Sequence, residues 1–115
     1  MPAFFAAAIA ASMREIREPD ECETMAEVRA GVDDVDRRIV DLIARRFAFM
    51  DAAARIKPDR ASVRDEPRKA EVISKVGAAA IERGLNAAMM RRLYEELIES
   101  SIAYEFEEFD RLRSA

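Results

Sequence analysis

The feature that most constrains this chain is a long run of apolar residues at helical spacing, between about Glu23 and Lys57. The apolar residues recur at alternating intervals of three and four, which is typical of a helix that buries one stripe against other helices. A helix of roughly 35 residues is about 50 Å long, more than a compact chain of this size can cover. We therefore expect much of the stripe to meet a second chain. The stripe comprises Met25, Val28, Val32, Val35, Ile39 and Leu42.

Two basic residues, Arg46 and Lys57, occupy the same stripe further along the predicted helix. They are close to three helical turns apart and so face one side of the helix to within about 20°. One interpretation is that each snorkels from a helix edge or pairs with a nearby acid. The other is that they bind an anionic ligand or an acidic partner, because a buried charge without a partner costs several kcal/mol.

A third cation, Arg29, lies on the flank of the same predicted helix. It precedes Arg46 by about 25 Å along the helix axis, at 1.5 Å per residue. One subunit cannot bring both guanidinium groups to one small pocket. In an antiparallel or interlocked dimer, Arg29 of one chain could approach Arg46 of the other.

The rest of the chain predicts two more helices. Pro58 ends the first helix, since the residue before a proline is disfavoured in the α region, and a loop follows. Asp65 is a candidate N-cap with Pro67 in the first turn, Gly84 is a candidate stop, and Asn86 is the N-cap of a third helix. The expected inner faces are Val72, Ile73, Val76 and Ala80 in the second helix, and Met90, Leu93, Tyr94, Leu97 and Ile98 in the third.

With only three glycines and four prolines, and few of the clusters that strands and hairpins need, the sequence predicts an all-α fold. It has three helices, of which the first is very long.

A hydroxyl and a carboxylate, Ser101 and Glu105, continue the apolar stripe of the third predicted helix. Tyr94 and Ile98 precede them at spacings of four and three residues, so all four share one face. Either the helix runs past the core into solvent at this point, or the polar pair belongs to a site. The nearby Ile102 favours the second interpretation, because apolar residues continue alongside.

Composition excludes several classes of function. A net charge of −4 argues against an undirected nucleic-acid binder, since phosphate contacts need a basic surplus. The single Cys22 cannot form an intrachain disulfide, and without histidine there is no Cys/His metal site or Ser-His-Asp triad.

The apolar opening, "MPAFFAAAIAAS", is too short to span a membrane and lacks the basic residues that begin a secretory signal. We interpret residues 1–19 as an N-terminal tail, disordered or a start-site extension, and residues 20–113 as the helical domain. The expected location is the cytoplasm, with no membrane partner, although a secretory role for residues 1–12 stays open.

Five motifs, in order, carry a resemblance to a known family. They are "VRAGVDDVD" with Arg29, "ARRF" with Arg46, "ARIK" with Lys57, "VRDEPR" after the loop, and "LIESSIAYE" with Ser101 and Glu105. Together they resemble the all-helical chorismate mutases and their isochorismate pyruvate-lyase relatives, over roughly residues 20–113. The resemblance implies an intertwined homodimer with two equivalent sites, each completed by an arginine from the partner.

The resemblance also implies a role for each motif residue. Arg29 would bind a substrate carboxylate across the subunits, Arg46 would bind the second carboxylate, and Lys57 would donate to the ether oxygen and a carboxylate. The remaining matches are Arg68 in the anion-binding wall, Asp65 at the ring hydroxyl through its backbone, Ser101 at a carboxylate, and Glu105 where many members have glutamine. Arg46, Lys57 and Glu105 would be catalytic.

One position departs from the family pattern. Many mutases have a glutamate that accepts a hydrogen bond from the ring hydroxyl, one residue after the arginine of the second helix, and this chain has Lys69 there. Lysine cannot accept a hydrogen bond and its charge is expected to alter the pocket. Isochorismate or a 4-amino analogue of chorismate therefore stays open as the substrate.

The reaction implied is the rearrangement of chorismate to prephenate, which needs no nucleophile, metal or cofactor. The protein must hold a flexible dianion in its reactive conformer and stabilise the charge that grows on the ether oxygen. An ionised carboxylate beside that oxygen would repel the charge, so Glu105 is expected to act in its protonated form. The alternatives are isochorismate pyruvate-lyase activity, mutase activity on a 4-amino analogue, and a non-catalytic helical dimer that binds an acidic partner.

Overall fold

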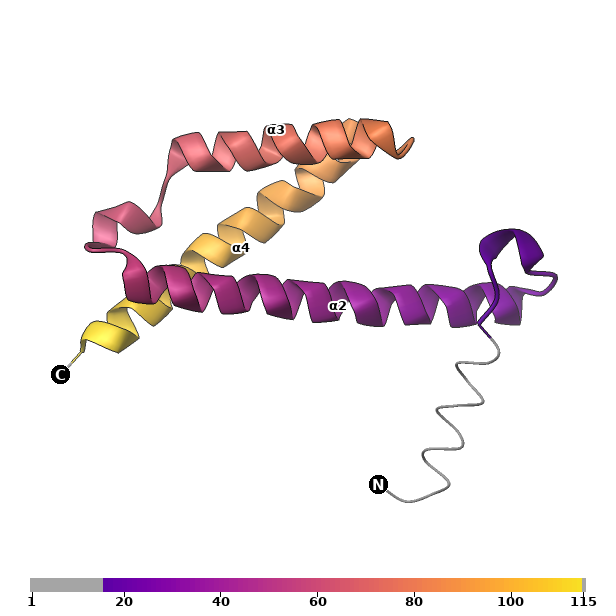
Figure 1. The fold of residues 1–115 in the computed structure, drawn as a ribbon, viewed down its shortest axis with the longest axis horizontal. Coiled ribbons are helices and arrows are strands. Elements are labelled where there is room, and N and C mark those ends of the chain that lie inside the picture. The colour runs from indigo at the N-terminus through magenta and orange to yellow at the C-terminus, as the bar shows by residue number, and fades with distance from the viewer. Residues whose placement is uncertain (1–15, 115) are drawn as a thin grey trace, which may run out of the picture. The chain divides into compact units, whose positions relative to one another are not determined.

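The computed structural model describes residues 16–114, so residues 1–15 of the tail predicted for residues 1–19 lie outside the described residues. The described chain contains three α-helices and two short 3-10 helices, with no strand among residues 16–114 (Figure 1). The order is η1 (Pro19–Glu21), α2 (Met25–Ile56), η2 (Arg60–Val63), α3 (Glu66–Glu82) and α4 (Ala87–Arg113). The prediction of an all-α chain with a very long first helix is confirmed.

Local capping interactions fix where the helices begin. At the start of α2, the Thr24 hydroxyl accepts from the Glu27 backbone N–H, and the Glu27 carboxylate accepts from the Thr24 N–H. This reciprocal pair is a capping box. The side chain of Asp65 accepts from the Arg68 N–H to cap α3, and that of Asn86 accepts from the Met89 N–H to cap α4.

The turn between α3 and α4 contains Gly84, whose φ of 71° lies in the left-handed region that favours glycine. The predicted caps of the second and third helices and the predicted stop at Gly84 are therefore confirmed. Together these three residues set the ends of a helical hairpin.

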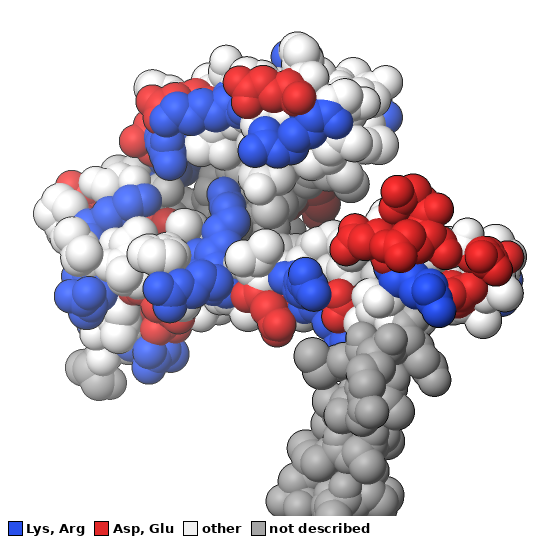
Figure 2. Space-filling model, turned by 45° about the vertical axis from the view of Figure 1, so that its right-hand side comes forward, with Lys and Arg blue, Asp and Glu red and all other residues white. Residues whose placement is uncertain are grey.

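The chain divides into two compact units within α2, after Arg45. The described part of the N-terminal unit consists of η1, the capping segment and the first part of α2. Its predicted apolar stripe is exposed in the single chain, with Leu42 at 69% and Met25 at 59%. Acidic side chains gather near the start of α2 (Figure 2). The exposure of the stripe agrees with the expectation that it needs a partner.

The C-terminal unit contains the last turns of α2, η2 and the α3–α4 hairpin (Figure 1). Its core is small: Ala54, Val63 and Phe109 are buried together, with Ile102 and Phe106 packed against them. Most of the inner-face predictions agree with the burial pattern. Leu93 does not, because it is 58% exposed, so its predicted burial is wrong for the single chain.

Polar contacts connect α4 to the end of α2. The Tyr104 hydroxyl donates to Asp51 over 2.5 Å and its ring meets Phe47 edge to face. Arg113 donates to the backbone carbonyls of Ala54 at 3.0 Å and Lys57 at 2.8 Å, while its guanidinium lies over the Phe109 ring. Arg113 thereby satisfies carbonyls that a helix end leaves without partners.

Within residues 16–114, no helix is both long enough and apolar enough to cross a membrane.

Candidate active site

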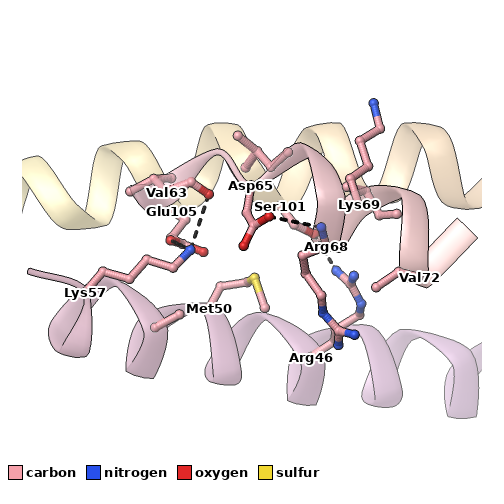
Figure 3. Close-up of a pocket in the computed structure, with 13 residues that line it drawn as sticks. Arg46, Met50, Lys57, Val63, Asp65, Arg68, Lys69, Val72, Ser101 and Glu105 are labelled. Atoms are coloured by element: carbon pink, nitrogen blue, oxygen red, sulfur yellow. Dashed lines mark hydrogen bonds and ion pairs between the residues drawn. The ribbon is translucent and has the colours of Figure 1, made fainter. Parts of the chain in front are cut away.

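A pocket of about 300 Å³ lies within the C-terminal unit, between the end of α2, the start of α3 and the middle of α4. Seven of the eight predicted site residues line it: Arg46, Lys57, Asp65, Arg68, Lys69, Ser101 and Glu105. They come from α2, α3, α4 and the segment that joins α2 to α3, and Figure 3 shows Arg46 and Arg68 reaching toward the same part of the pocket. The eighth, Arg29, belongs to the N-terminal unit and does not line the pocket.

The carboxylate of Glu105 is the most buried charge of the pocket, with its side chain 4% exposed. Its Oε2 lies 2.7 Å from Nζ of Lys57, which also donates to the Val63 carbonyl at 3.2 Å. The Lys57 side chain is 27% exposed. Lys57 therefore does pair with an acid, as one of the two interpretations held, but it does so at the wall of an open pocket.

The guanidinium of Arg46 has a neutral partner. Its Nη1 donates to Oγ of Ser101 over 2.6 Å, and the Ser101 hydroxyl in turn donates a hydrogen bond to the Leu97 carbonyl. The group also lies 5.9 Å from the centre of the Tyr94 ring. Because Ser101 is 2% exposed, this contact is fixed while the rest of the guanidinium faces the pocket.

The predicted stripe on α4 therefore faces the pocket. Ser101 and Glu105 are both buried; Ser101 binds Arg46 of α2, and Glu105 binds Lys57, which directly follows α2. Their spacing of four residues places both on one face of α4. The alternative, in which α4 simply runs out into solvent here, is wrong.

Arg68 and Lys69, consecutive residues of α3, differ in where their charges lie. Arg68 descends from α3 toward the same part of the pocket as Arg46 (Figure 3), and it also contacts Glu71. The Lys69 ammonium is directed the other way, toward α4, where it bonds Glu95 at 2.6 Å and Glu99 at 2.9 Å. The expected effect of the Lys69 charge on the pocket is thus countered by two acids.

Apolar side chains complete the pocket wall, and several were not predicted as site residues. They are Met50, Ala53, Val63, Val72, Ile98 and Ile102. Met50 lies four residues after Arg46, so helical spacing alone could have assigned it to the same face. The Val63 carbonyl, by contrast, is a backbone acceptor at the end of η2, for which the sequence carries no signal.

The arrangement can bind a small anion with more than one negative group. Arg46, Lys57 and Arg68 supply several donors from different directions, and apolar residues supply the remaining surface. Among residues 16–114, no three acidic or cysteine side chains converge where they could hold a metal ion.

Comparison with known proteins identifies the family. The model for chorismate mutase type II matches residues 28–106, most of the chain. The chain belongs to this family. The matched range contains all eight predicted site residues, from Arg29 to Glu105.

A relative is named for a different activity. The isochorismate pyruvate lyase of Pseudomonas aeruginosa is 28% identical over 100 residues, which cover 87% of this chain and 99% of the relative. The match therefore spans nearly the whole of that enzyme. Both the family and this relative were anticipated by the resemblance in the sequence.

Proposed function

We propose that the protein is a chorismate mutase, which rearranges the dianion chorismate to prephenate. The observation that carries the proposal is the convergence of Arg46, Lys57 and Arg68 on one pocket in a chain of this family. Guanidinium groups pair with carboxylates through two parallel hydrogen bonds, whereas a compact ammonium suits a single oxygen. Arg46 and Arg68 are thus suited to carboxylates and Lys57 to the ether oxygen.

In this proposal Lys57 and Glu105 act together on the breaking bond. Lys57 stabilises the negative charge on the ether oxygen, and Glu105 donates a hydrogen bond in its protonated form. Without substrate, Lys57 holds the Glu105 carboxylate at 2.7 Å. An incoming dianion would compete with the Glu105 carboxylate for the Lys57 ammonium, because both are negatively charged.

The proposed assembly is a homodimer in which Arg29 of one chain completes the pocket of the other. Supporting this, the exposed apolar stripe of α2 is longer than scattered surface residues explain, with Val32 and Val35 about half exposed. In the C-terminal unit Leu93 is exposed as well. Covering both surfaces with a second chain would remove apolar area from water.

A mixing experiment tests the shared site. Arg29→Ala and Arg46→Ala are each expected to lower kcat/KM by about 100-fold or more while keeping the helix content, since each removes a fixed charge partner. Refolded together in equal amounts, half of the dimers would carry one intact site, so about a quarter of wild-type activity should return. If both arginines serve one site from the same chain, no activity returns. Arg55→Ala, an exposed arginine of α2 outside the pocket, is the matched control.

Isochorismate pyruvate-lyase activity is the second candidate, favoured by the name of the Pseudomonas aeruginosa relative. The two reactions use similar dianions and differ in product. Parallel incubations with chorismate and isochorismate, monitored for prephenate and for salicylate with pyruvate, separate them. Neither product, together with no binding of a bicyclic dicarboxylate transition-state analogue, would overturn both in favour of a non-catalytic role.

A further inference from the structure

Lys69 is a pocket residue whose charge lies outside the pocket. Its side chain is only 16% exposed and lines the α3 wall beside Val72. Its ammonium, however, is bound by two carboxylates of α4, and Figure 3 shows it directed away from Arg46 and Lys57. Because the ammonium lies at α4, the part of Lys69 that lines the pocket is its hydrocarbon stem.

The two acids that hold Lys69 are arranged for this contact. Glu95 and Glu99 are four residues apart, so they present both carboxylates on one face of α4. Glu99 is itself fixed by the Arg64 guanidinium, with contacts of 2.8 and 3.1 Å. The hydrogen bonds from Arg64 and then Lys69 lower the pKa of Glu99 to about 2, and those to Glu95 and Glu99 raise the pKa of Lys69.

We propose that Glu95 and Glu99 are positioning residues that hold the Lys69 ammonium out of the pocket, so that the α3 wall offers a bound anion hydrocarbon and no further positive charge. A lysine stem is flexible and reaches over several ångströms, so an unrestrained ammonium at this position would be free to turn toward an anion in the pocket. The pocket already contains Arg46, Lys57 and Arg68. The acid pair thus sets the charge that the site presents.

This inference rests on the proposed function for the identity of the ligand, but the position of Lys69 can be tested without it. The variant pair Glu95→Met and Glu99→Met keeps side-chain length and helix propensity while removing both charged acceptors. In a crystal structure of the ligand-free double variant, we expect the Lys69 Nζ to have left α4. An ammonium that stays in its wild-type position would overturn the proposal, whatever reaction the enzyme catalyses.

The consequence for binding is tested by calorimetry with the bicyclic dicarboxylate analogue. The double variant should bind the dianion about fivefold more tightly, because a freed ammonium adds a charge near the ligand. Adding Lys69→Met should abolish that gain. A gain that persists in the triple variant would show that Lys69 is not its source and would overturn the proposal, as would an unchanged Kd in the double variant.

Two single variants separate this role from a merely structural one. Glu95→Met disturbs Lys69 without touching Arg64, whereas Arg64→Met disturbs Glu99 from the loop side and leaves Glu95 in place. We expect Glu95→Met to give part of the gain in affinity and Arg64→Met to give little. A larger gain in affinity for Arg64→Met than for Glu95→Met would assign the effect to the loop and overturn the proposal. If the analogue fails to bind the wild-type protein, the proposed function fails, and the crystal structure of the double variant still decides where Lys69 lies.

Discussion

Replacing Lys57 by methionine removes the ion-pair partner of a buried carboxylate. Glu105 Oε2 lies 2.7 Å from the ammonium, and the Glu105 side chain is 4% exposed. Breaking a buried ion pair by removing one member costs about 3–5 kcal/mol, because the remaining charge is left uncompensated. Lys57→Met should therefore lower the free energy of unfolding by that amount near pH 7.

A matched pair of variants isolates the charge. Glu105→Gln keeps an oxygen that accepts from Lys57 and should cost about 1 kcal/mol, as for one weakened hydrogen bond. The double variant Lys57→Met with Glu105→Gln has no buried charge and should be more stable than Lys57→Met alone. Urea unfolding followed by circular dichroism, at one protein concentration, measures all four proteins. A double variant that is no more stable than Lys57→Met alone would refute the reasoning.

Three further predictions concern stability outside the pocket centre. Tyr104→Phe should lose about 1–2 kcal/mol in urea unfolding, because Asp51 loses the hydroxyl that donates to it; an unchanged midpoint would contradict this. Gly84→Ala should cost about 1 kcal/mol in thermal unfolding, since φ is 71° there, and Gly84→Asn should cost less; equal losses would argue against a backbone cause. Glu99 has a pKa lowered from 4.5 to about 2, so its contribution is complete above pH 4.5 and is lost as pH falls toward 2. Glu99→Gln should make acid unfolding less steep in that window, and identical acid profiles would exclude a role for Glu99.

Sequence patterns predicted the helices and their caps because these depend on neighbours in the chain. Asp65 and Asn86 each accept from a backbone N–H three residues later, a local geometry that residue type and position already indicate. The long first helix was predicted from its period, and its ends agree to within two residues. Its apolar stripe is exposed, so a regular apolar pattern in the sequence does not guarantee that the single chain buries those residues.

The pairings across the pocket were less accessible from the sequence. That Lys57 meets Glu105 depends on how α2 and α4 are rotated against each other, which no local pattern encodes. The ion pairs of Lys69 could not be predicted from the sequence either, since its partner acids lie 26 and 30 residues further on. Chemical type therefore indicated which residues gather at the site, while tertiary packing decides which of their charges face the ligand.

The contacts of Arg113 make the far end of α4 part of the support for Lys57, the lysine that we propose to be catalytic. Its Nη2 binds the backbone carbonyl of Lys57 itself, and its Nη1 binds the Ala54 carbonyl one turn earlier. A purification tag or fusion partner joined directly after this arginine would compete for space at the end of α2. Its effect would then be measured as altered turnover, although the added residues never enter the pocket. When the protein is engineered, the end of α4 should be left unaltered, because it supports the candidate site.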